Sequence, residues 1–338
     1  MKVVEIRDAF GFEHLRICER EAPQPGPGQV LINVKAASLN YRDLLTIQGF
    51  YNPKQKLPLV PCSDGAGEVA AIGDGVTRAK VGDRVAGCFA QGWFAGPPSR
   101  EKLLNTTLGG PLDGMLAEQI VLREDGVVSI PDHLTNEEAA TLPCAALTAW
   151  SALARHAQTK PGDTVLVLGT GGVSIFALQF AQMMGATVIV TSSSDEKLAR
   201  AKQLGAAHGI NYSTNANWSK QIREITGGEG VDHIIEVGGT GTLTQSMRSV
   251  KMGGTISLIG VLSGPEAPLN LTPILMQDIR MQGVIVGPRD SFEEMNRAIA
   301  LHQMKPAVDR VFSMVDIHAA VEYMAAGKHF GKVCVRVA

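Results

Sequence analysis

The chain of 338 residues is 45% hydrophobic, which is enough to fill two ordinary cores, so two domains are expected. A formal net charge of −2 gives no basic excess, and this argues against a nucleic-acid-binding protein. Apolar runs such as Val165–Leu168 are much shorter than the roughly 18 residues of a membrane span, and the charged, alternating opening segment is unlike a signal or transit peptide. The five cysteines are scattered and never form a CxxC pair, so we expect reduced thiols and a cytoplasmic protein.

Short strand patterns fill the first 125 residues. They include QVLINVKAASL, GEVAAIG and DRVAGCF, which are separated by Gly and Pro clusters without any alternation of helix and strand. This pattern predicts a compact, mostly antiparallel β domain. The stretch 135–157 is predicted to be helical and to bridge two domains, with Thr135 or Asn136 as its N-cap and Glu138 in its first turn.

From Asp163 onward the sequence predicts six strands connected by helices. These strands are apolar throughout, which is typical of a parallel sheet covered on both faces. The fold class is therefore α/β, with a doubly wound parallel sheet of the Rossmann type. After Gly287, a helical pattern and the alternating tail GKVCVRV resemble the first part of the chain, so we expect the chain to return to it. The predicted domains are residues 1–125 with 288–338, and residues 126–287.

The first of these strands runs into a glycine turn and then directly into an apolar helix, in the sequence VLVLGTGGVSIFALQF. A pyrophosphate at a helix N-terminus meets unpaired N–H groups and the positive end of the helix dipole, and side chains in the turn would block it. The turn residues Gly169, Gly171, Gly172 and Val173 are therefore predicted to bind a dinucleotide. Ser174 replaces the third glycine of the usual motif, and we expect it to be tolerated because that glycine serves helix packing.

The end of the second strand, TSSSDEK, bears on which dinucleotide binds. NAD-specific proteins place a carboxylate there, whereas this chain has Ser192 and Ser193, with Lys197 one helical step further on. A serine cluster with a lysine can receive a 2′-phosphate that a carboxylate would repel, so NADP(H) is favoured. Asp195 is better explained as an acidic residue in a helix's first turn, although it could also reach the ribose.

Several motifs resemble the medium-chain dehydrogenase/reductase superfamily over essentially the whole chain, and within it the zinc-independent branch typified by quinone oxidoreductases. The resemblance rests on SLNYRDLLTIQGFY, PCSDGAGEVAAIGDGVTRAKVGDRV, LPCAALTAWSAL, GTGGVSIFALQFA, VDHIIEVGGTGTL, GGTISLIGVLSG and HFGKVCVRV. It implies an N-terminal GroES-like domain, an inserted Rossmann domain, a C-terminal return to the first domain, and a nicotinamide in the cleft between them.

The resemblance also bears on zinc. The positions that match the catalytic zinc ligands of alcohol dehydrogenases in this superfamily are Asn40, Ser63 and Cys144, of which only the cysteine is a strong zinc ligand. The segment Phe89–Gly114, which matches the lobe that holds the structural zinc, contains no cysteine. We therefore expect neither metal.

Without a Lewis acid, the hydride acceptor must be activated by hydrogen bonds and a proton donor. This favours quinones, enones and alkenals, which spread the incoming charge over a conjugated carbonyl. Asn40 and Tyr41 are the candidate donors. The resemblance matches Asp43 and Asp64 to acidic positions behind the absent metal, although both could simply pair with arginines for structure.

On the cofactor side, four residues follow the fourth and fifth predicted strands, at the carboxyl edge of the sheet where ligands bind: Gly238, Ile259, Gly260 and Val261. The resemblance implies that Thr148 lies near the nicotinamide and Tyr212 near the adenosine phosphate. Lys332 could close over the cofactor or be an ordinary surface lysine.

Phe89–Gly114 is either a wall or lid of a hydrophobic substrate pocket or a segment whose aromatic residues simply pack the domain. The last predicted strand, MQGVIVG, would be an apolar sheet edge, which favours a homodimer. The sequence thus predicts an NADP(H)-dependent, zinc-free reductase of a small hydrophobic carbonyl or quinone substrate, with no nucleic-acid or membrane partner. An alcohol dehydrogenase acting on small alcohols and a non-catalytic NADPH-binding protein remain the alternatives.

Overall fold

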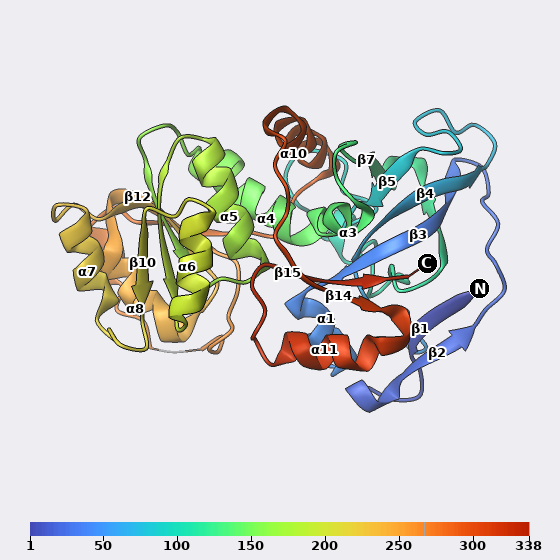
Figure 1. Ribbon diagram of the computed structural model, residues 1–338, viewed down its shortest axis with the longest axis horizontal. Helices are drawn as coiled ribbons and strands as arrows, with labels where there is room; N and C mark the ends of the chain where they lie inside the picture. The colour runs from blue at the N-terminus through green and yellow to red at the C-terminus, as the bar shows by residue number, and fades with distance from the viewer. Residues whose placement is uncertain (267, 338) are drawn as a thin grey trace. The chain divides into compact units, whose positions relative to one another are not determined.

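The computed structural model describes residues 1–266 and 268–337 (Figure 1). The chain forms two compact units: Met1–Leu147 together with the chain from Val286 onward, and Thr148–Ile285. The sequence places residues 126–147 in the second domain, whereas the structure places them in the first unit. The reason is that β7 (Val127–Ser129) pairs with β5 (Arg84–Gly87) and α3 (Asn136–Ala140) packs on the strands of the same unit.

The first unit is built on a mainly antiparallel sheet of seven strands in its described residues, in the order β14-β15-β3-β4-β5-β7, with β6 also paired to β3. Its remaining strands are β3 (Gln29–Leu39), β4 (Asp64–Ile72), β6 (Gln119–Arg123), β14 (Val308–Ser313) and β15 (Lys332–Arg336), and a separate hairpin joins β1 (Lys2–Ile6) to β2 (Leu15–Glu19). Its helices are α1 (Tyr41–Ile47), α2 (Arg100–Leu103), α10 (Arg289–His302) and α11 (Ile317–Ala325), with 3-10 turns at Phe12–His14, Glu124–Gly126 and Met314–Asp316.

The C-terminal strand β15 positions the candidate site. It pairs antiparallel with β3, so that Val333 lies opposite Leu39. Both strands are buried along almost their whole length, and Val30, Ile32 and Val335 belong to the core of the unit. The pairing places Lys332, the first residue of β15, beside the end of β3 and the start of α1.

The second unit holds a parallel sheet in the order β10-β9-β8-β11-β12-β13, which confirms the predicted α/β fold with a Rossmann-type sheet. Its strands are β8 (Thr164–Leu168), β9 (Thr187–Ser192), β10 (His208–Asn211), β11 (Val231–Glu236), β12 (Val250–Leu258) and β13 (Arg280–Gly283). Its helices are α4 (Leu147–Trp150, which begins one residue before the unit), α5 (Gly172–Met183), α6 (Asp195–Gln203), α7 (Trp218–Ile225), α8 (Thr240–Ser249) and α9 (Thr272–Met276).

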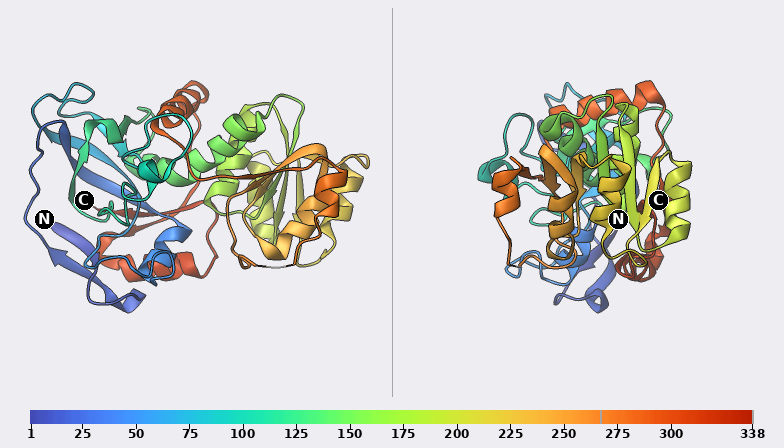
Figure 2. Two further views of the ribbon diagram at one scale, coloured as in Figure 1. Left: turned by 180° about the vertical axis from the view of Figure 1, so that it is seen from behind. Right: turned by 90° about the vertical axis from the view of Figure 1, so that its left-hand side faces the viewer.

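Helices cover both faces of this sheet (Figure 2). On one face, Leu166 and Leu168 of β8 form a core with Trp218, Ile222 and Met247 from α7 and α8. The strand order reverses between β8 and β11, and such a reversal is where ligands of open α/β sheets bind.

The predicted helix at 135–157 is broken into several pieces. Thr135 is its N-cap and forms a capping box with Glu138. After α3 the chain continues as the π-helical segments Leu142–Ala146 and Ser151–Ala157 on either side of α4. Such wide turns are uncommon and often occur at functional sites. None of the helices in the described part of the chain has both the length and the apolar character needed to cross a bilayer.

We expect Phe180→Ala to lower the free energy of unfolding of the second unit by about 3–5 kcal/mol. Phe180 is fully buried, stacks on Phe176 with ring centroids 5.9 Å apart, and meets the edge of Trp150 at 5.4 Å. Urea denaturation followed by tryptophan fluorescence measures the change. Leu275→Ala is the control, because Leu275 is 80% exposed and should change the free energy by less than about 0.5 kcal/mol. Equal effects of the two substitutions would contradict this account of the core.

Candidate active site

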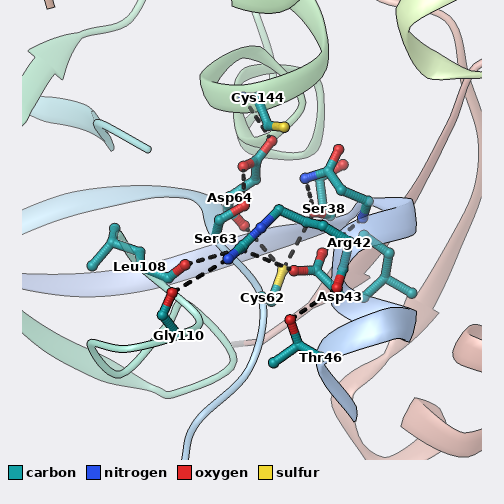
Figure 3. A network of polar contacts seen from close by, with 12 residues as sticks. Ser38, Arg42, Asp43, Thr46, Cys62, Ser63, Asp64, Leu108, Gly110 and Cys144 are labelled. Carbon is teal, nitrogen blue, oxygen red and sulfur yellow. Dashed lines mark hydrogen bonds and ion pairs between the residues drawn. The ribbon is translucent and has the colours of Figure 1, made fainter. Parts of the chain in front are cut away.

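A buried polar network surrounds the N-terminus of α1 in the first unit (Figure 3). Asn40 is the N-cap of this helix, and its backbone N–H donates to Asp43 Oδ2 at 2.8 Å. Burial raises the pKa of Asp43, and the Arg42 guanidinium, whose Nη1 lies 3.6 Å from Asp43 Oδ1, opposes that rise. The sequence pattern LNYRD therefore folds locally into a capped helix start that holds a carboxyl group inside the unit.

Asp64, the first residue of β4, is the second buried carboxyl group of the network. Its Oδ1 accepts from Ser63 Oγ at 2.7 Å, and its Oδ2 accepts from the backbone N–H of Cys144 at 3.0 Å. Burial raises the pKa of Asp64 to about 6, against the opposing effects of the Lys332 ammonium and of side-chain hydrogen bonds from Asn40 and Ser63. Asp64 thus joins β4 to the segment that carries Cys144.

Lys332 is buried in this network rather than at the surface. Its Nζ donates to Leu39 O at 2.7 Å and to Asn40 Oδ1 at 2.6 Å. The structure therefore brings Lys332 together with Asn40 and Asp64, where the sequence predicts contact with the cofactor or with solvent. The burial of Lys332 could have been predicted from the alternating tail GKVCVRV only if the pairing of this tail with β3 had been known.

Arg42 connects α1 to the segment Phe89–Gly114. Its Nη1 donates to Leu108 O at 3.0 Å and its Nη2 to Gly110 O at 3.4 Å. Its guanidinium also lies over the rings of Tyr51 and Phe89, at 4.8 and 4.9 Å from their centroids. Phe89 is buried, as is Trp93, so these two aromatic residues pack the unit.

Tyr41 does not join the network. It is the first residue of α1, and it is 48% exposed. Its phenol is therefore accessible to a ligand, whereas Asn40, Asp43 and Asp64 lie inside the unit.

In the second unit, the turn after β8 presents an open helix N-terminus. Gly169 has φ +73°, and Gly171 is the N-cap of α5 with no side-chain cap. A Cβ built on Gly171 would meet no atom within 4 Å, so the space in front of the helix is free for a ligand. Ser174 Oγ donates to Leu168 O at 2.7 Å, which explains how the departure from the glycine motif is accommodated. The turn, with Gly172 and the half-buried Val173 in the first turn of the helix, fits a pyrophosphate.

The serine cluster lies at the end of β9 as the sequence predicts. Ser192 is buried and its Oγ accepts from the Ser194 N–H at 3.2 Å, whereas Ser193 is exposed. Ser194 caps α6 by accepting from the Lys197 N–H at 3.3 Å.

Two neighbours complete this edge of the sheet. Asp195 lies in the first turn of α6, and its Oδ1 accepts from Asn211 Nδ2 at 2.8 Å, in agreement with its structural interpretation. The backbone N–H of the half-exposed Tyr212 donates to Ser192 O at 3.0 Å, which brings Tyr212 next to the serines.

The remaining predicted cofactor residues lie at two adjacent turns, after β11 and after β12. Gly238 follows β11, and Ile259, Gly260 and Val261 follow β12. Both turns are hydrogen-bonded to Glu236, a buried carboxylate that sequence reasoning missed. The sequence feature that could have indicated Glu236 is a charged residue at the end of an apolar strand, in HIIEVGG. Thr148 lies buried in α4, at the start of the same unit.

Comparison with known proteins identifies the family. The alcohol dehydrogenase GroES-like domain model matches residues 26–132, and the zinc-binding dehydrogenase model matches residues 172–301. The chain is 44% identical to a zinc-type alcohol dehydrogenase-like protein of Schizosaccharomyces pombe, over 97% of this chain and 96% of the relative. It is 31% identical to an acryloyl-coenzyme A reductase of Metallosphaera sedula (98% and 99%) and 28% identical to quinone oxidoreductase-like protein 2 of Bos taurus (94% and 88%).

Two solved structures are similar over nearly the whole chain. An NAD-dependent alcohol dehydrogenase has 33% identity and a TM-score of 0.93, with 100% of both chains covered. A mycobacterial protein complexed with NADPH has 28% identity and a TM-score of 0.81, with 99% of both chains covered. The chain therefore belongs to the medium-chain dehydrogenase/reductase superfamily, whose members bind a nicotinamide cofactor, and it is an oxidoreductase.

The residues present do not fit the catalytic zinc that the family model's description implies. Asn40 and Ser63 offer an amide and a hydroxyl, and Asn40 Oδ1 already accepts from the Lys332 ammonium. Cys144 is the one strong zinc ligand among the three matching positions, and a zinc site needs at least three protein ligands. Within residues 1–266 and 268–337, no group of three or more His, Cys, Asp or Glu side chains is placed to hold a metal ion.

The raised pKa of Asp64 predicts a specific pH dependence of stability. Because the folded-state pKa of about 6 lies above the ordinary 3.8, the folded protein takes up this proton first as the pH falls. As the pH falls from about 7 to about 4, the free energy of unfolding of the wild type should therefore rise relative to that of Asp64→Asn, by on the order of 2–3 kcal/mol. Urea titrations of both proteins across this range measure the difference, and a difference that falls toward low pH would contradict the burial of a charged Asp64.

Proposed function

We propose that the protein is an NADP(H)-dependent, zinc-independent oxidoreductase that reduces activated carbonyl acceptors, namely quinones, enones or alkenals. The observation that carries this proposal is the placement of Lys332, Asn40 and Asp64. The Lys332 ammonium and the Asp64 carboxyl group both bond the amide of Asn40, which stands at one of the three positions that match the zinc ligands of alcohol dehydrogenases in this superfamily. On this proposal, hydrogen bonding takes the place of a Lewis acid.

Asn40 is the proposed donor to the acceptor oxygen. The Lys332 ammonium binds Oδ1 of the amide, which fixes the orientation of the group and leaves Nδ2 as its donor. The same cation polarises the amide and strengthens its N–H groups as donors. One N–H of Nδ2 serves the Asp64 carboxyl group. The contact of Nδ2 to Ser38 O is long, at 3.5 Å, so an acceptor oxygen can replace it at little cost. The exposed phenol of Tyr41 is the proposed second donor and can deliver a proton.

The second unit is proposed to bind the cofactor, which supplies the hydride when bound. The N-terminus of α5 holds the pyrophosphate, and the backbone groups of Gly238, Ile259, Gly260 and Val261 hold the nicotinamide half. Ser192, Ser193 and Lys197 receive the 2′-phosphate, with Tyr212 beside them. Gly171 supports this assignment most directly, because its turn leaves open space in front of the helix.

We expect the protein to bind NADPH at least about tenfold more tightly than NADH. Ser192→Asp should reverse this preference, because a carboxylate at the end of β9 repels a 2′-phosphate and accepts hydrogen bonds from the ribose hydroxyls. Fluorescence titration with each coenzyme measures both affinities. Ala199→Asp, which adds the same charge at an exposed position of α6, should leave the preference unchanged. Tighter binding of NADH by the wild type would refute the assignment of the serines.

Asn40→Leu should reduce kcat for a quinone or enal by about 100-fold while the affinity for NADPH stays within about twofold, since the amide acts on the acceptor and not on the coenzyme. The assay uses protein whose zinc content has been measured, and the expected content is far below one atom per chain. Stoichiometric zinc, or turnover that a chelator abolishes, would favour the alternative of an alcohol dehydrogenase, which the names of several relatives support.

The exposed apolar residues near β13 support a homodimer. This strand is the edge of the sheet, and Leu275, Met276 and Ile285 beside it are exposed. Pairing of two such edges would bury them. The scattered cysteines, none of which stands in a CxxC pair, support the proposal of a cytoplasmic location.

A further inference from the structure

Glu236, the last residue of β11, is a fully buried carboxylate with an unusual number of donors. Its Oε1 accepts from the backbone N–H of Gly238 at 2.8 Å, from the N–H of Gly239 at 3.1 Å, and from Thr242 Oγ1 at 2.6 Å. Its Oε2 accepts from Ser246 Oγ. The carboxylate therefore fixes the turn after β11 and the first two turns of α8.

The backbone of the same residue fixes the neighbouring turn. The carbonyl oxygen of Glu236 accepts from the N–H of Ile259 at 2.9 Å and from the N–H of Gly260 at 3.3 Å. The two turns also touch, because a Cβ on Gly260 would lie 2.7 Å from Val237 O. One residue thus determines the position of both turns, and neither can move without breaking bonds to it.

Glu236 also occupies the N-terminus of α8. Gly239, the N-cap of this ten-residue helix, has no side chain to cap it, and its own N–H donates to the carboxylate, which also complements the helix dipole. The N–H groups of the first two helical residues, Thr240 and Gly241, bind Gly264 O at 3.3 Å and Ser263 Oγ at 2.8 Å. At the same edge of the sheet, the N-terminus of α5 has no such carboxylate and faces open space at Gly171. An anionic ligand at this edge therefore finds one helix N-terminus open and the other already neutralised.

We propose that Glu236 is the positioning residue for the nicotinamide half of the cofactor, acting through the turns 237–239 and 259–261. It holds the backbone groups of the two turns in the arrangement that the nicotinamide and its ribose require. The inference rests on the proposed function only in taking a nicotinamide dinucleotide as the ligand of this edge.

The test compares two ligands on two variants. Glu236→Ala removes every side-chain bond, and Glu236→Gln keeps the shape of the side chain but loses its charge. The ligands are the coenzyme that the wild type binds more tightly and the ADP-ribose analogue of that coenzyme, which has the same phosphates but no nicotinamide. We expect Glu236→Ala to weaken coenzyme binding at least about tenfold and Glu236→Gln about threefold, with the affinity for the analogue within twofold of wild type in both.

Asp232→Asn is the matched control. Asp232 lies on the same strand at its opposite end, where it accepts from the Thr164 N–H at 2.8 Å and pairs with Lys251. Its loss should lower the melting temperature without changing the affinity for either ligand. If Glu236→Ala does not fold, Glu236→Gln alone carries the comparison.

The outcomes separate the inference from the proposed function. Equal weakening of both ligands would show that Glu236 only stabilises the unit, and unchanged coenzyme affinity in both variants would show that the turns do not need it. Either result overturns the inference while the proposed function stands. Wild-type protein that binds neither NADPH nor NADH would overturn both.

Discussion

The stability of the first unit depends on the compensation of the charged groups buried in its interior. Asp43 and Asp64 are buried carboxyl groups, and burying a charge is costly unless a partner compensates it. The compensating cations are Arg42 and Lys332, which are also buried, so the network holds two acidic and two basic side chains. Lys332 reaches its place because β15 pairs with β3, and the bond from its Nζ to Asn40 Oδ1 joins residues 292 positions apart in the chain. The C-terminal strand is thus part of the candidate site.

The same requirement explains the contrast between two turns of the second unit. Backbone N–H groups at the carboxyl edge of a parallel sheet must bind either the protein or a ligand. Glu236 binds those of Gly238 and Gly239, and Gly264 O and Ser263 Oγ bind those of Thr240 and Gly241, so that helix N-terminus has no need of an outside anion. The turn at Gly171 has no internal carboxylate, so its groups remain available. The two turns therefore differ: the first helix N-terminus can accept an outside anion, and the second is held by groups of the protein itself.

The features that depend on residues close together in the sequence could be predicted from it. The apolar strands and intervening helices predicted the parallel sheet, and the glycine turn and the serines at the end of β9 lie where the sequence places them. The position of Lys332 was not predictable, since it depends on the pairing of β15 with β3. Glu236 was missed although its carboxylate bonds only nearby residues, because a charged residue at the end of an apolar strand does not by itself show which backbone groups it binds. The unit boundary at Leu147 was also missed, because the segment 126–147 belongs with the strands it pairs with rather than with the helix that follows.

Arg42 links the charge network to the segment Phe89–Gly114. Its guanidinium lies beside Asp43, and its N–H groups hold the carbonyls of Leu108 and Gly110 while Phe89 packs on its face. Both ends of the segment are therefore attached to the residue that compensates a buried carboxylate. Lysine has a single ammonium and cannot make this forked contact, so an arginine is required here for geometry as well as charge. The arrangement of the polar site and that of the long segment beside it are consequently set by one side chain, and a change that loosens the pairing of Arg42 with Asp43 also releases the segment.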